Sequence, residues 1–283
     1  MKNLEAVIAA IQYIETNLTS KKIDLDIVAE AVHYSKYHVH RIFNDTVGLS
    51  IHDYTQRRQL TEAAKLLVFS HKSILDIAVL AGYESQQAFS NIFKSMYKQS
   101  PYQFRKNEVF YPLQLEYNFR DQRKSLENSK NNTKRDIHIA KEADITLWMD
   151  LVRLAIDGFP YLKEDEHLVS LKYHIANKGA LLMTENGISI GAMMINYETG
   201  SIDFLAVHPL YKKQGIARDL LDVALCELLE NKEISTTTYR EGDKADTGYR
   251  KTLKDLGFAE AELLTEFGYP TQKMILLREA LND

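Results

Sequence analysis

The feature that most constrains this chain is an internal repeat in its first hundred residues. Residues 27–50, IVAEAVHYSKYHVHRIFNDTVGLS, align with residues 77–100, IAVLAGYESQQAFSNIFKSMYKQS. The pair Ile42–Phe43 recurs as Ile92–Phe93, a separation of 50 residues, and the alignment needs one extra residue in the turn of the second copy. A repeat of this length indicates one supersecondary motif present twice.

Each copy reads as a short helix, a tight turn and a second helix, which is the helix-turn-helix outline. Ser35 and Ser85 stand where the second helices would begin, and serine is a preferred N-cap residue. Residues 51–70, between the copies, are apolar at helical spacing and predict a connecting helix. Two such second helices, held about one turn of DNA apart, can enter successive major grooves.

Charge divides the chain into a mildly basic front and an acidic back. Residues 1–107 hold 13 Lys and Arg against 10 Asp and Glu, a net of +3. Residues 135–283 hold 17 Lys and Arg against 25 Asp and Glu, a net of −8. The two halves therefore favour different partners, and a net of +3 leaves the nature of the first partner to the motifs.

Residues 8–107 closely resemble the DNA-binding domain of the AraC/XylS regulator family. The resemblance is carried by VAEAVHYSKYHVHRIF, by GLSIHDYTQRRQLTEAAKLL and by DIAVLAGYESQQAFSNIFK with QSPYQFRK, in the family's order. It implies an all-α domain over residues 1–107 with two helix-turn-helix units, and double-stranded DNA as the partner. Asn91 stands where the family usually has arginine, and Lys98 where it usually has glycine.

The polar faces of the two second helices supply the candidate DNA contacts. Gln and Asn side chains can pair with adenine, Arg and Lys with guanine, and others with phosphate. A face exposed only to water is the alternative, and the repeat favours DNA contact. Phe43, Phe89 and Phe93 are expected in the core. The predicted DNA-contacting residues are Lys36, Tyr37, His38, His40, Arg41, Gln86, Gln87, Ser90 and Asn91.

A joint between two domains is predicted over residues 108–134. Its first part, EVFYPLQLEYNF, carries aromatic residues and can pack on either domain. The later run KSLENSKNNTK is polar and lacks hydrophobic periodicity, which is typical of a linker. We therefore place the boundary near residue 130 and a second domain over 135–283.

Strands dominate the prediction for the second domain. RDIHIA predicts a short strand, and ITLWMDLVRLAI a helix capped by Asp144. Apolar stretches then alternate with the turns ENG and ETG, which predicts a run of antiparallel strands. The segment FLAVHPLYKKQGIARDLL reads as a strand, a turn at Pro209 and a helix. A strand, a loop, a helix ending at LGF and a last strand, TQKMILLRE, complete the order.

The basic loop KKQGIA is a candidate phosphate site. A helix N-terminus presents unpaired N–H groups and the positive end of the helix dipole, so it favours a bound phosphate. Gly215 leaves the backbone open to a pyrophosphate, and the flanking Lys212, Lys213 and Arg218 add positive charge. A plain strand–turn–helix with lysines in water is the alternative. The loop lacks both the P-loop and the dinucleotide fingerprints.

The order of elements over residues 135–278 resembles the GNAT acetyltransferase family. Its Q/R-x-x-G-x-G/A motif stands here as KKQGIA, with lysine in the Q/R place. The resemblance implies an α+β fold with a mixed, mostly antiparallel sheet flanked by helices, and acetyl-CoA as cofactor. It implies that Leu205 and Val207 line the pantetheine arm. The pyrophosphate would lie on Lys212, Lys213, Gln214, Gly215, Ile216, Ala217 and Arg218.

Acetyl transfer to an amine needs a proton acceptor for the amine and a proton donor for the leaving thiolate. The family's usual acid is a tyrosine four residues before the glycine of LGF, where this chain has Leu253. Tyr249, one turn earlier, is the candidate acid, with packing at the domain edge as its alternative. Asp203 and Glu198 are candidate bases or solvated carboxylates, and backbone N–H groups of a splayed strand are expected to polarise the carbonyl. The residues that would line the acceptor pocket or cap its strand are Tyr239, Arg240 and Glu241.

Other single residues carry structural predictions. Trp148 and Cys226 lie in helical patterns and are expected in the core. His138, His167, His174 and His208 are scattered without metal-ligand spacing, so no metal site is expected. One cysteine, no apolar run of about 20 residues and no signal-peptide pattern predict a cytoplasmic protein without a membrane partner.

Three functions fit these features. The first is a sequence-specific regulator with an active N-acetyltransferase domain that acts on an amine of a small molecule or a protein. The second is a regulator whose GNAT-like domain only senses acetyl-CoA or a small effector and changes DNA affinity by linkage. The third is mainly an acetyltransferase whose helical module docks a protein. The cofactor loop favours a domain that binds its cofactor. Because Leu253 stands in place of the family's usual acid, the non-catalytic sensor stays an alternative.

Overall fold

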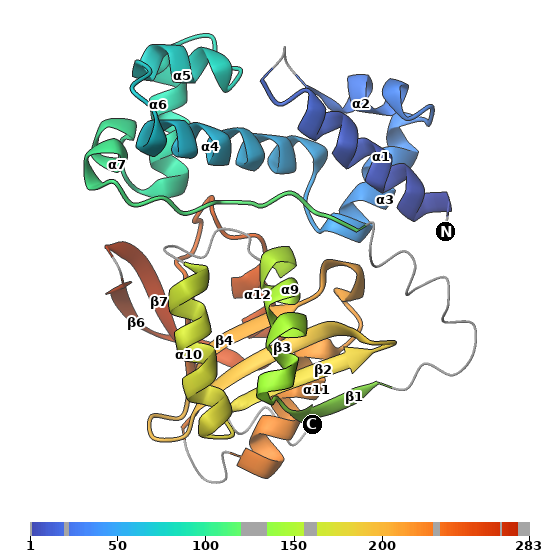
Figure 1. Ribbon diagram of the computed structural model, residues 1–283, viewed down its shortest axis with the longest axis vertical. Coiled ribbons are helices and arrows are strands. Elements are labelled where there is room, and N and C mark those ends of the chain that lie inside the picture. Colours follow the sequence, from blue (N-terminus) through green and yellow to red (C-terminus); the bar gives the residue numbers. More distant parts are fainter. Residues whose placement is uncertain are drawn as a thin grey trace. The chain divides into compact units, whose positions relative to one another are not determined.

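A computed structural model of the 283-residue chain describes residues 2–19, 23–119, 135–155, 163–228, 233–266 and 268–276. The described residues fall into two compact units, one ending at residue 119 and one beginning at residue 135. Figure 1 labels the elements of both units. The polar run KSLENSKNNTK, predicted as a linker, lies outside the described residues.

The first unit is all-α in its described part, as the repeat predicts. The connecting helix is α4, and it begins and ends within a residue of the predicted segment. The helices are α1 (Lys2–Thr16), α2 (Leu25–Ala31), α3 (Lys36–Val47), α4 (Ile51–Phe69), α5 (Ile74–Leu80), α6 (Gln86–Tyr97) and α7 (Pro101–Asn107).

The two copies of the repeat fold as α2–α3 and α5–α6. The turn between the helices covers residues 32–35 in the first copy and 81–85 in the second, so the extra residue lies in the second turn. Ser35 accepts a hydrogen bond from the His38 N–H, and Ser85 from the Ala88 N–H, which confirms both predicted N-caps.

Residues 109–119 pack on the first unit, where Tyr111, Leu113, Tyr117 and Phe119 are buried. The N–H groups of Leu113 and Gln114 donate to the Thr61 hydroxyl at 3.0 and 3.2 Å. Arg58, which is 6% exposed, donates to the Gln114 carbonyl and to both oxygens of Glu15. The buried arginine thus joins α1, α4 and this segment, and its pKa is raised because Glu15 outweighs the effect of burial.

A mixed sheet with the order β1-β2-β3-β4-β5-β7-β6 forms the second unit. Neighbouring strands run antiparallel except β4 and β5, which run parallel. This is the mostly antiparallel sheet predicted from the sequence. The strands are β1 (Asp136–Ile139), β2 (Ala180–Glu185), β3 (Ile188–Asn196), β4 (Ser201–Val207), β5 (Ser235–Tyr239), β6 (Phe258–Glu266) and β7 (Tyr269–Leu276).

Helices cover both faces of this sheet (Figure 1). On one face lie α9 (Ile145–Ala155) and α10 (Glu164–Ala176), and Trp148 of α9 is fully buried, as predicted. On the other face lies α11 (Ile216–Val223), which continues as a π-helical turn over Ala224–Leu228. The helix α12 (Tyr249–Asp255) precedes β6.

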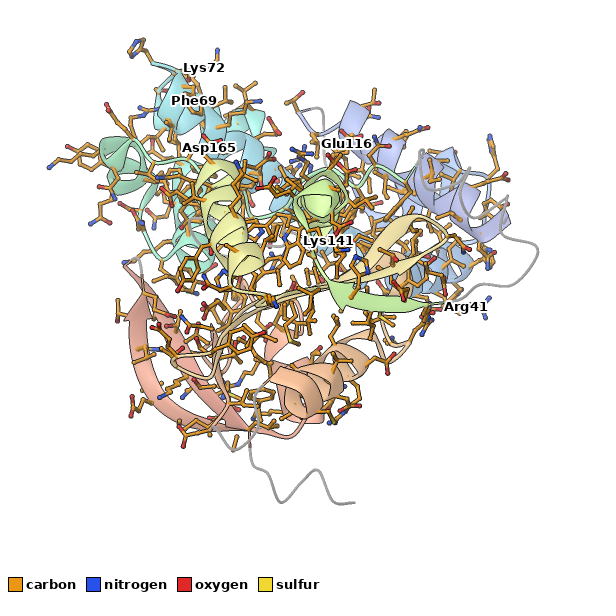
Figure 2. All side chains as sticks on the ribbon, turned by 60° about the horizontal axis from the view of Figure 1, so that its bottom comes forward. Arg41, Phe69, Lys72, Glu116, Lys141 and Asp165 are labelled. Atoms are coloured by element: carbon orange, nitrogen blue, oxygen red, sulfur yellow. The ribbon has the colours of Figure 1, made fainter. Side chains whose placement is uncertain are left out.

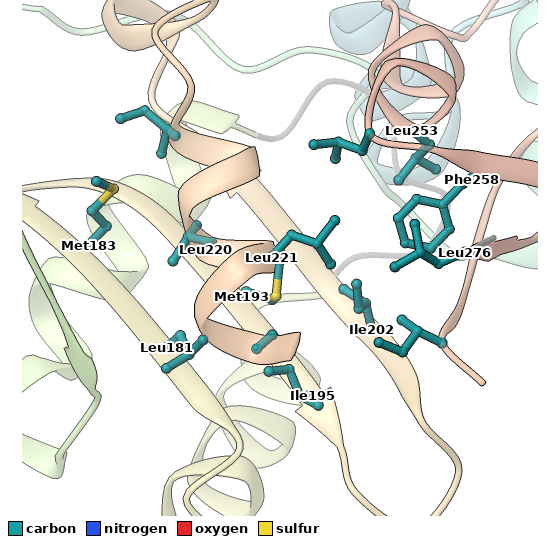
Figure 3. Packing of buried hydrophobic residues seen from close by; sticks show 14 of the residues in the cluster. Leu181, Met183, Met193, Ile195, Ile202, Leu220, Leu221, Leu253, Phe258 and Leu276 are labelled. Carbon is teal, nitrogen blue, oxygen red and sulfur yellow. The ribbon is translucent and has the colours of Figure 1, made fainter. Parts of the chain in front are cut away.

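The core beneath α11 joins the two halves of the sheet. Leu220 and Leu221 of α11 pack over strand side chains that include Met193, Ile195 and Ile202 (Figure 3). Leu253, Phe258 and Leu276 close the same core on the side of β6 and β7. Continuous apolar packing therefore fixes the position of α11 on the sheet.

Several features of the second unit differ from the sequence analysis. The helix α10 and the strand β6 were not predicted. Asp144 ends a 3₁₀ turn and accepts from the Lys141 N–H, instead of capping α9 from its own position. Cys226 is exposed rather than buried, and it lies in the π-helical turn that follows α11.

Candidate functional site

The first candidate DNA-reading helix is α3, which presents a polar face and buries the opposite one. Lys36, Tyr37, His40 and Arg41 are exposed, and His38 is half-buried (Arg41 is labelled in Figure 2). Tyr37 is 82% exposed, which is unusual for a tyrosine without a partner surface. The buried face consists of Val39, Ile42, Phe43 and Val47.

Local contacts order part of this polar face. The His38 ring stacks on Tyr34 with centroids 5.2 Å apart. The Lys36 ammonium lies 3.3 Å from the Asp26 carboxylate of α2, and Asn44 Nδ2 lies 3.3 Å from His40 Nε2.

The second candidate DNA-reading helix, α6, has a smaller polar face without charges in its first turn. Gln86, Gln87 and Asn91 are exposed and Ser90 is half-buried. The Gln87 amide donates to Asn91 Oδ1 at 3.0 Å, one helical turn away. Phe89 and Phe93 are buried, and so is Phe43 of α3, which confirms their prediction as core residues.

The helix α4 sets the separation of the two copies. Its 19 residues span about 28 Å at 1.5 Å per residue. This length is of the order of the 34 Å turn of B-DNA. A continuous helix of this length can hold the two candidate DNA-reading helices, α3 and α6, at a spacing that suits one face of a duplex.

The second candidate site begins where β4 ends. His208 and Pro209 lead into a 3₁₀ turn over Pro209–Tyr211, and His208 Nδ1 accepts from the Leu210 N–H at 3.1 Å. Burial lowers the pKa of His208 to about 4, so its ring is neutral and able to accept this bond at pH 7.

The loop after this turn has the backbone shape of an anion cradle. Lys213 and Gly215 both have left-handed backbone, with φ of 62° and 82°. Gly215 is the N-cap of α11 and has no side chain to accept a bond, so the N–H groups of Ile216, Ala217 and Arg218 have no intrahelical acceptor. A Cβ built on Gly215 would meet only Asp219 Oδ1, at 3.8 Å, which leaves the space over the cradle open.

The side chains of this loop take different roles. Lys213 and Gln214 are exposed, and Lys212 is half-buried. Arg218 donates to the Asp255 carbonyl at 3.1 Å, which directs it towards the end of α12. The Ile216 side chain is 1% exposed in the core, so only its backbone can face a ligand.

Gly191 of β3 explains how α11 reaches this position. A Cβ at residue 191 would lie 2.4 Å from Ile216 Cγ2 and 3.0 Å from Leu220 Cδ1. The absence of a side chain therefore lets the first turn of α11 lie directly on the sheet.

Beside the cradle, β4 parts from β5. The described residues pair these strands at one position, Ser201 with Ser235, supported by a bond from the Thr236 hydroxyl to the Ile202 carbonyl. Asp203 is an extra residue in β4, since Met194 pairs with Phe204 and Ile195 with Ile202. This bulge marks the start of the separation, and the half-buried Leu205 and Val207 follow it.

Asp203 points to the face of the sheet covered by α10. His174 of α10 is 4% exposed; its Nε2 lies 3.1 Å from Asp203 Oδ2 and its Nδ1 lies 2.8 Å from the Ser170 carbonyl. Burial lowers the pKa of His174, but the bonds to Asp203 and to Ser170 outweigh it and raise the pKa overall. The Ser201 hydroxyl donates to the other Asp203 oxygen at 2.5 Å.

The other predicted catalytic residues lie outside β4, which carries Asp203. Glu198 is exposed in the turn before β4, whereas the cradle follows the opposite end of β4. Tyr249 is the half-buried first residue of α12, and its N–H donates to Asp246 at 2.9 Å. Leu253 has no ionisable group, and its side chain is 5% exposed in the core.

The three residues predicted to line an acceptor pocket differ in their burial and contacts. Tyr239 is buried at the end of β5, and Glu241 is exposed. Arg240 donates to the carbonyls of Thr271 and Leu264 at 3.2 and 2.7 Å, which ties β5 to β6 and β7. Arg240 therefore has a structural role in this unit.

Two residues next to the candidate site were not singled out for it in the sequence analysis. His174, interpreted only as a scattered histidine, pairs with Asp203. Arg135, at the start of the second unit, donates to the carbonyl and the side chain of Gln214, 79 residues along the chain. Neither belongs to a local motif, so only the fold shows their positions.

Two negative findings apply to the described residues alone. No helix among them is long and apolar enough to span a membrane. Nor do three or more His, Cys, Asp or Glu side chains gather there as a possible metal site.

Comparisons with known proteins match both units. The family described as "Helix-turn-helix domain" matches residues 28–107, and the family described as "Acetyltransferase (GNAT) domain" matches residues 162–275. The probable transcription factor PqrA of Proteus vulgaris is 41% identical over 98 residues, which cover 34% of this chain and 80% of that protein. The transcriptional activator AarP of Providencia stuartii is 36% identical over 99 residues, covering 35% and 73%.

Other relatives are longer or cover a different unit. The uncharacterized regulator YbfP of Bacillus subtilis is 40% identical over 101 residues, covering 36% of this chain and 34% of that protein. Among solved structures, the C-terminal domain of AraT from Geobacillus stearothermophilus covers 41% of this chain and 95% of its own, with 27% identity and a TM-score of 0.36. A GNAT-family acetyltransferase from Bacillus cereus covers 51% and 99%, with 17% identity and a TM-score of 0.41.

Proposed function

The chain belongs to the AraC-type helix-turn-helix regulators and carries a GNAT acetyltransferase domain, and we propose that it is a sequence-specific regulator that binds acetyl-CoA and acetylates an amine. The DNA would lie on α3 and α6, whose exposed Arg, Lys, Gln and Asn side chains suit base and phosphate contacts.

One observation carries the acetyl-CoA part of the proposal: β4 leaves β5 after a single residue pair at its start, and its other end leads into a helix N-terminus whose first N–H groups have no intrahelical acceptor. The parted edge of β4 can pair with an extended, amide-containing chain such as pantetheine. The N–H groups of Ile216, Ala217 and Arg218 can hold its pyrophosphate, and Lys213 can add charge from the exposed side of the loop.

The side chains around the bulge would supply proton transfer. When bound, acetyl-CoA supplies an activated acetyl thioester. Asp203, which is oriented by its hydrogen bonds with His174 and Ser201, would attract an ammonium group and receive its proton directly or through water. We assign the Tyr249 hydroxyl as the proton donor to the leaving thiolate. Glu198 lies in the turn before β4, five residues before Asp203, and we assign it no role.

The acceptor would be a primary amine, of a small molecule or of a protein. The neutral amine attacks the acetyl carbon, the new C–N bond forms as the C–S bond breaks, and the thiol departs with one proton. These requirements leave the acceptor's size open, and they place its amine near the bulge at Asp203.

A second function, acetyl-CoA sensing without transfer, is favoured by one observation. Leu253 occupies the position of the family's usual acid and is buried in the core. A domain that binds the cofactor without turning it over would change DNA affinity only if DNA-bound and free forms differ in cofactor affinity.

Calorimetry and turnover on the full chain separate these functions. Acetyl-CoA binding with acetyl transfer to any member of a panel of amines supports the enzyme. Binding without transfer to any amine, together with a shift in DNA affinity, supports the sensor. Absence of acetyl-CoA binding overturns both. A gel-shift series at several salt concentrations, with duplexes selected from random sequence, tests the regulator part.

A further inference from the structure

The Arg135 guanidinium makes three hydrogen bonds around the cofactor loop. Its Nη1 donates to the Gln214 carbonyl at 3.2 Å, and its Nη2 donates to Gln214 Oε1 at 2.7 Å. Its Nε donates to Glu185 Oε1, at the end of β2, at 3.1 Å. We propose that Arg135 is a positioning residue that sets the loop in its phosphate-binding shape; this inference rests on the proposed acetyl-CoA binding.

Peptide geometry connects this contact to the cradle. The Gln214–Gly215 peptide is planar and trans, so its C=O and N–H point in opposite directions. By holding the Gln214 carbonyl, Arg135 directs the Gly215 N–H to the side away from the guanidinium. Glycine has access to many backbone angles, so without this bond the peptide plane at residue 215 can turn.

Two further bonds make the arrangement rigid. The Gln214 amide donates to the Leu210 carbonyl at 3.1 Å, which closes the loop on itself. The Glu185 side chain is 12% exposed and fixes the direction of the guanidinium, whose own side chain is 33% exposed. A chain of contacts from β2 through Arg135 to Gln214 and Leu210 therefore supports the left-handed residues Lys213 and Gly215.

Because Glu185 partly neutralises Arg135, the guanidinium acts by orienting the loop more than by adding charge. This distinguishes it from Lys213, which is exposed and free to meet a phosphate directly. A fork of donors is needed to reach both oxygens of Gln214, and lysine lacks that fork.

The test compares CoA with pantetheine, which lacks the pyrophosphate and the nucleotide. Arg135→Ala should weaken CoA binding by about tenfold, measured by calorimetry on the full chain, while leaving pantetheine binding unchanged. Arg135→Lys should restore only part of the loss. Arg153→Ala is the matched control, since Arg153 is also paired with carboxylates but lies on α9.

A double variant separates positioning from direct contact. If Arg135 acts through Gln214, Arg135→Ala combined with Gln214→Ala should bind CoA more weakly than Gln214→Ala alone, because the bond to the Gln214 carbonyl survives in that single variant, but the combined loss should be smaller than the product of the two single losses. Losses that multiply would mean that Arg135 touches the phosphate itself and would overturn the proposal, as would unchanged CoA binding in Arg135→Ala.

A measurement on the protein without CoA tests the positioning of the loop independently of the proposed function. The NMR shift of the Gly215 N–H should change in Arg135→Ala and not in Arg153→Ala, with Trp148 emission confirming that the unit is folded. If wild type binds no CoA but this shift changes, the proposed function fails and the positioning of the loop stands. If the shift does not change, the inference fails.

Discussion

The buried His174 of α10 and the exposed Asp203 of the bulge in β4 form a pair, with His174 Nε2 3.1 Å from Asp203 Oδ2. Since the other ring nitrogen lies 2.8 Å from the Ser170 carbonyl, both nitrogens face oxygen acceptors. Only the doubly protonated ring can donate to both, which agrees with the raised pKa of His174.

Asp203→Asn should lower the pKa of His174, because only the Ser170 bond then opposes the effect of burial. In wild type the raised pKa contributes stability that is fully present below about pH 6.5 and is lost as the pH rises through the folded value. NMR titration of the histidine rings measures the pKa, with His174→Gln identifying the resonance. An unchanged pKa in Asp203→Asn would contradict the pairing.

Acid should destabilise the second unit through His167 and His208. Burial lowers the pKa of each to about 4, with His174 adding to the effect at His167. Their neutral forms contribute stability above about pH 6.5 that is lost as the pH falls towards 4, about 2 kcal/mol for each group at pH 5. Urea unfolding followed by Trp148 emission measures it, since Trp148 is the chain's single tryptophan.

The variant His167→Gln isolates the contribution of His167 to this loss of stability. His167 Nε2 accepts from the Trp148 ring N–H at 3.0 Å, and a glutamine oxygen can replace this acceptor without titrating. His167→Gln should remove about half of the drop in unfolding free energy between pH 7 and pH 5. A drop of unchanged size would mean that other groups dominate the acid response.

Gly215→Glu should weaken acetyl-CoA binding by about a hundredfold or more, because a carboxylate would stand over the cradle and repel the pyrophosphate. The matched control is Gly187→Glu. Gly187 also has a positive φ, of 78°, and a Cβ there meets nothing within 4 Å, so both variants carry similar backbone strain. Calorimetry should show normal affinity for the control, and equal losses in both variants would trace the effect to strain.

Arg41→Ala should cost about 1–3 kcal/mol of DNA affinity, concentrated on one base position, if Arg41 reads a guanine. Lys65→Ala removes an exposed cation from α4 and should leave that position's preference intact. Binding to duplexes with single base changes measures the loss. A uniform loss over all duplexes would assign Arg41 to a phosphate instead.

Lys98→Gly should stabilise the first unit by about 0.5–1 kcal/mol. Lys98 ends α6 with a φ of 59°, the left-handed position that Gly48 occupies at the end of α3. Left-handed backbone costs a residue with a side chain about 1–2 kcal/mol, and the Lys98 ammonium bond to the Ser95 carbonyl offsets part of it. Thermal unfolding by circular dichroism measures the gain, and Gly48→Lys should have the opposite sign.

The features that were predicted correctly from the sequence depend on residues close together in the chain. Ser35 and Ser85 cap their helices, and Phe43, Phe89 and Phe93 lie in the core, because each depends on neighbours a few residues away. The start of α11 at Gly215 was predicted for the same reason, since a glycine before an apolar helical pattern is a local signal, and the phosphate site there stays a prediction.

Features that depend on distant partners were not visible. Arg58 reads as a surface cation, yet Glu15, 43 residues earlier, allows its burial. The bulge at Asp203 depends on the register of β3, and the largely exposed strand β6 lacks a continuous apolar run that would predict a strand. Where a polar side chain ends up depends on a partner that only the tertiary fold supplies.

The single residue pair between β4 and β5 has a consequence for the cooperativity of unfolding within the sheet. Several register pairs join each neighbouring couple of strands within β1–β4 and within β5, β7 and β6, whereas Ser201–Ser235 is the one register pair between these two groups in the described strands. Amide hydrogen exchange should therefore divide the sheet into two groups that open with different free energies. A ligand chain lying along β4 would act as a missing strand, and both groups would then exchange as one.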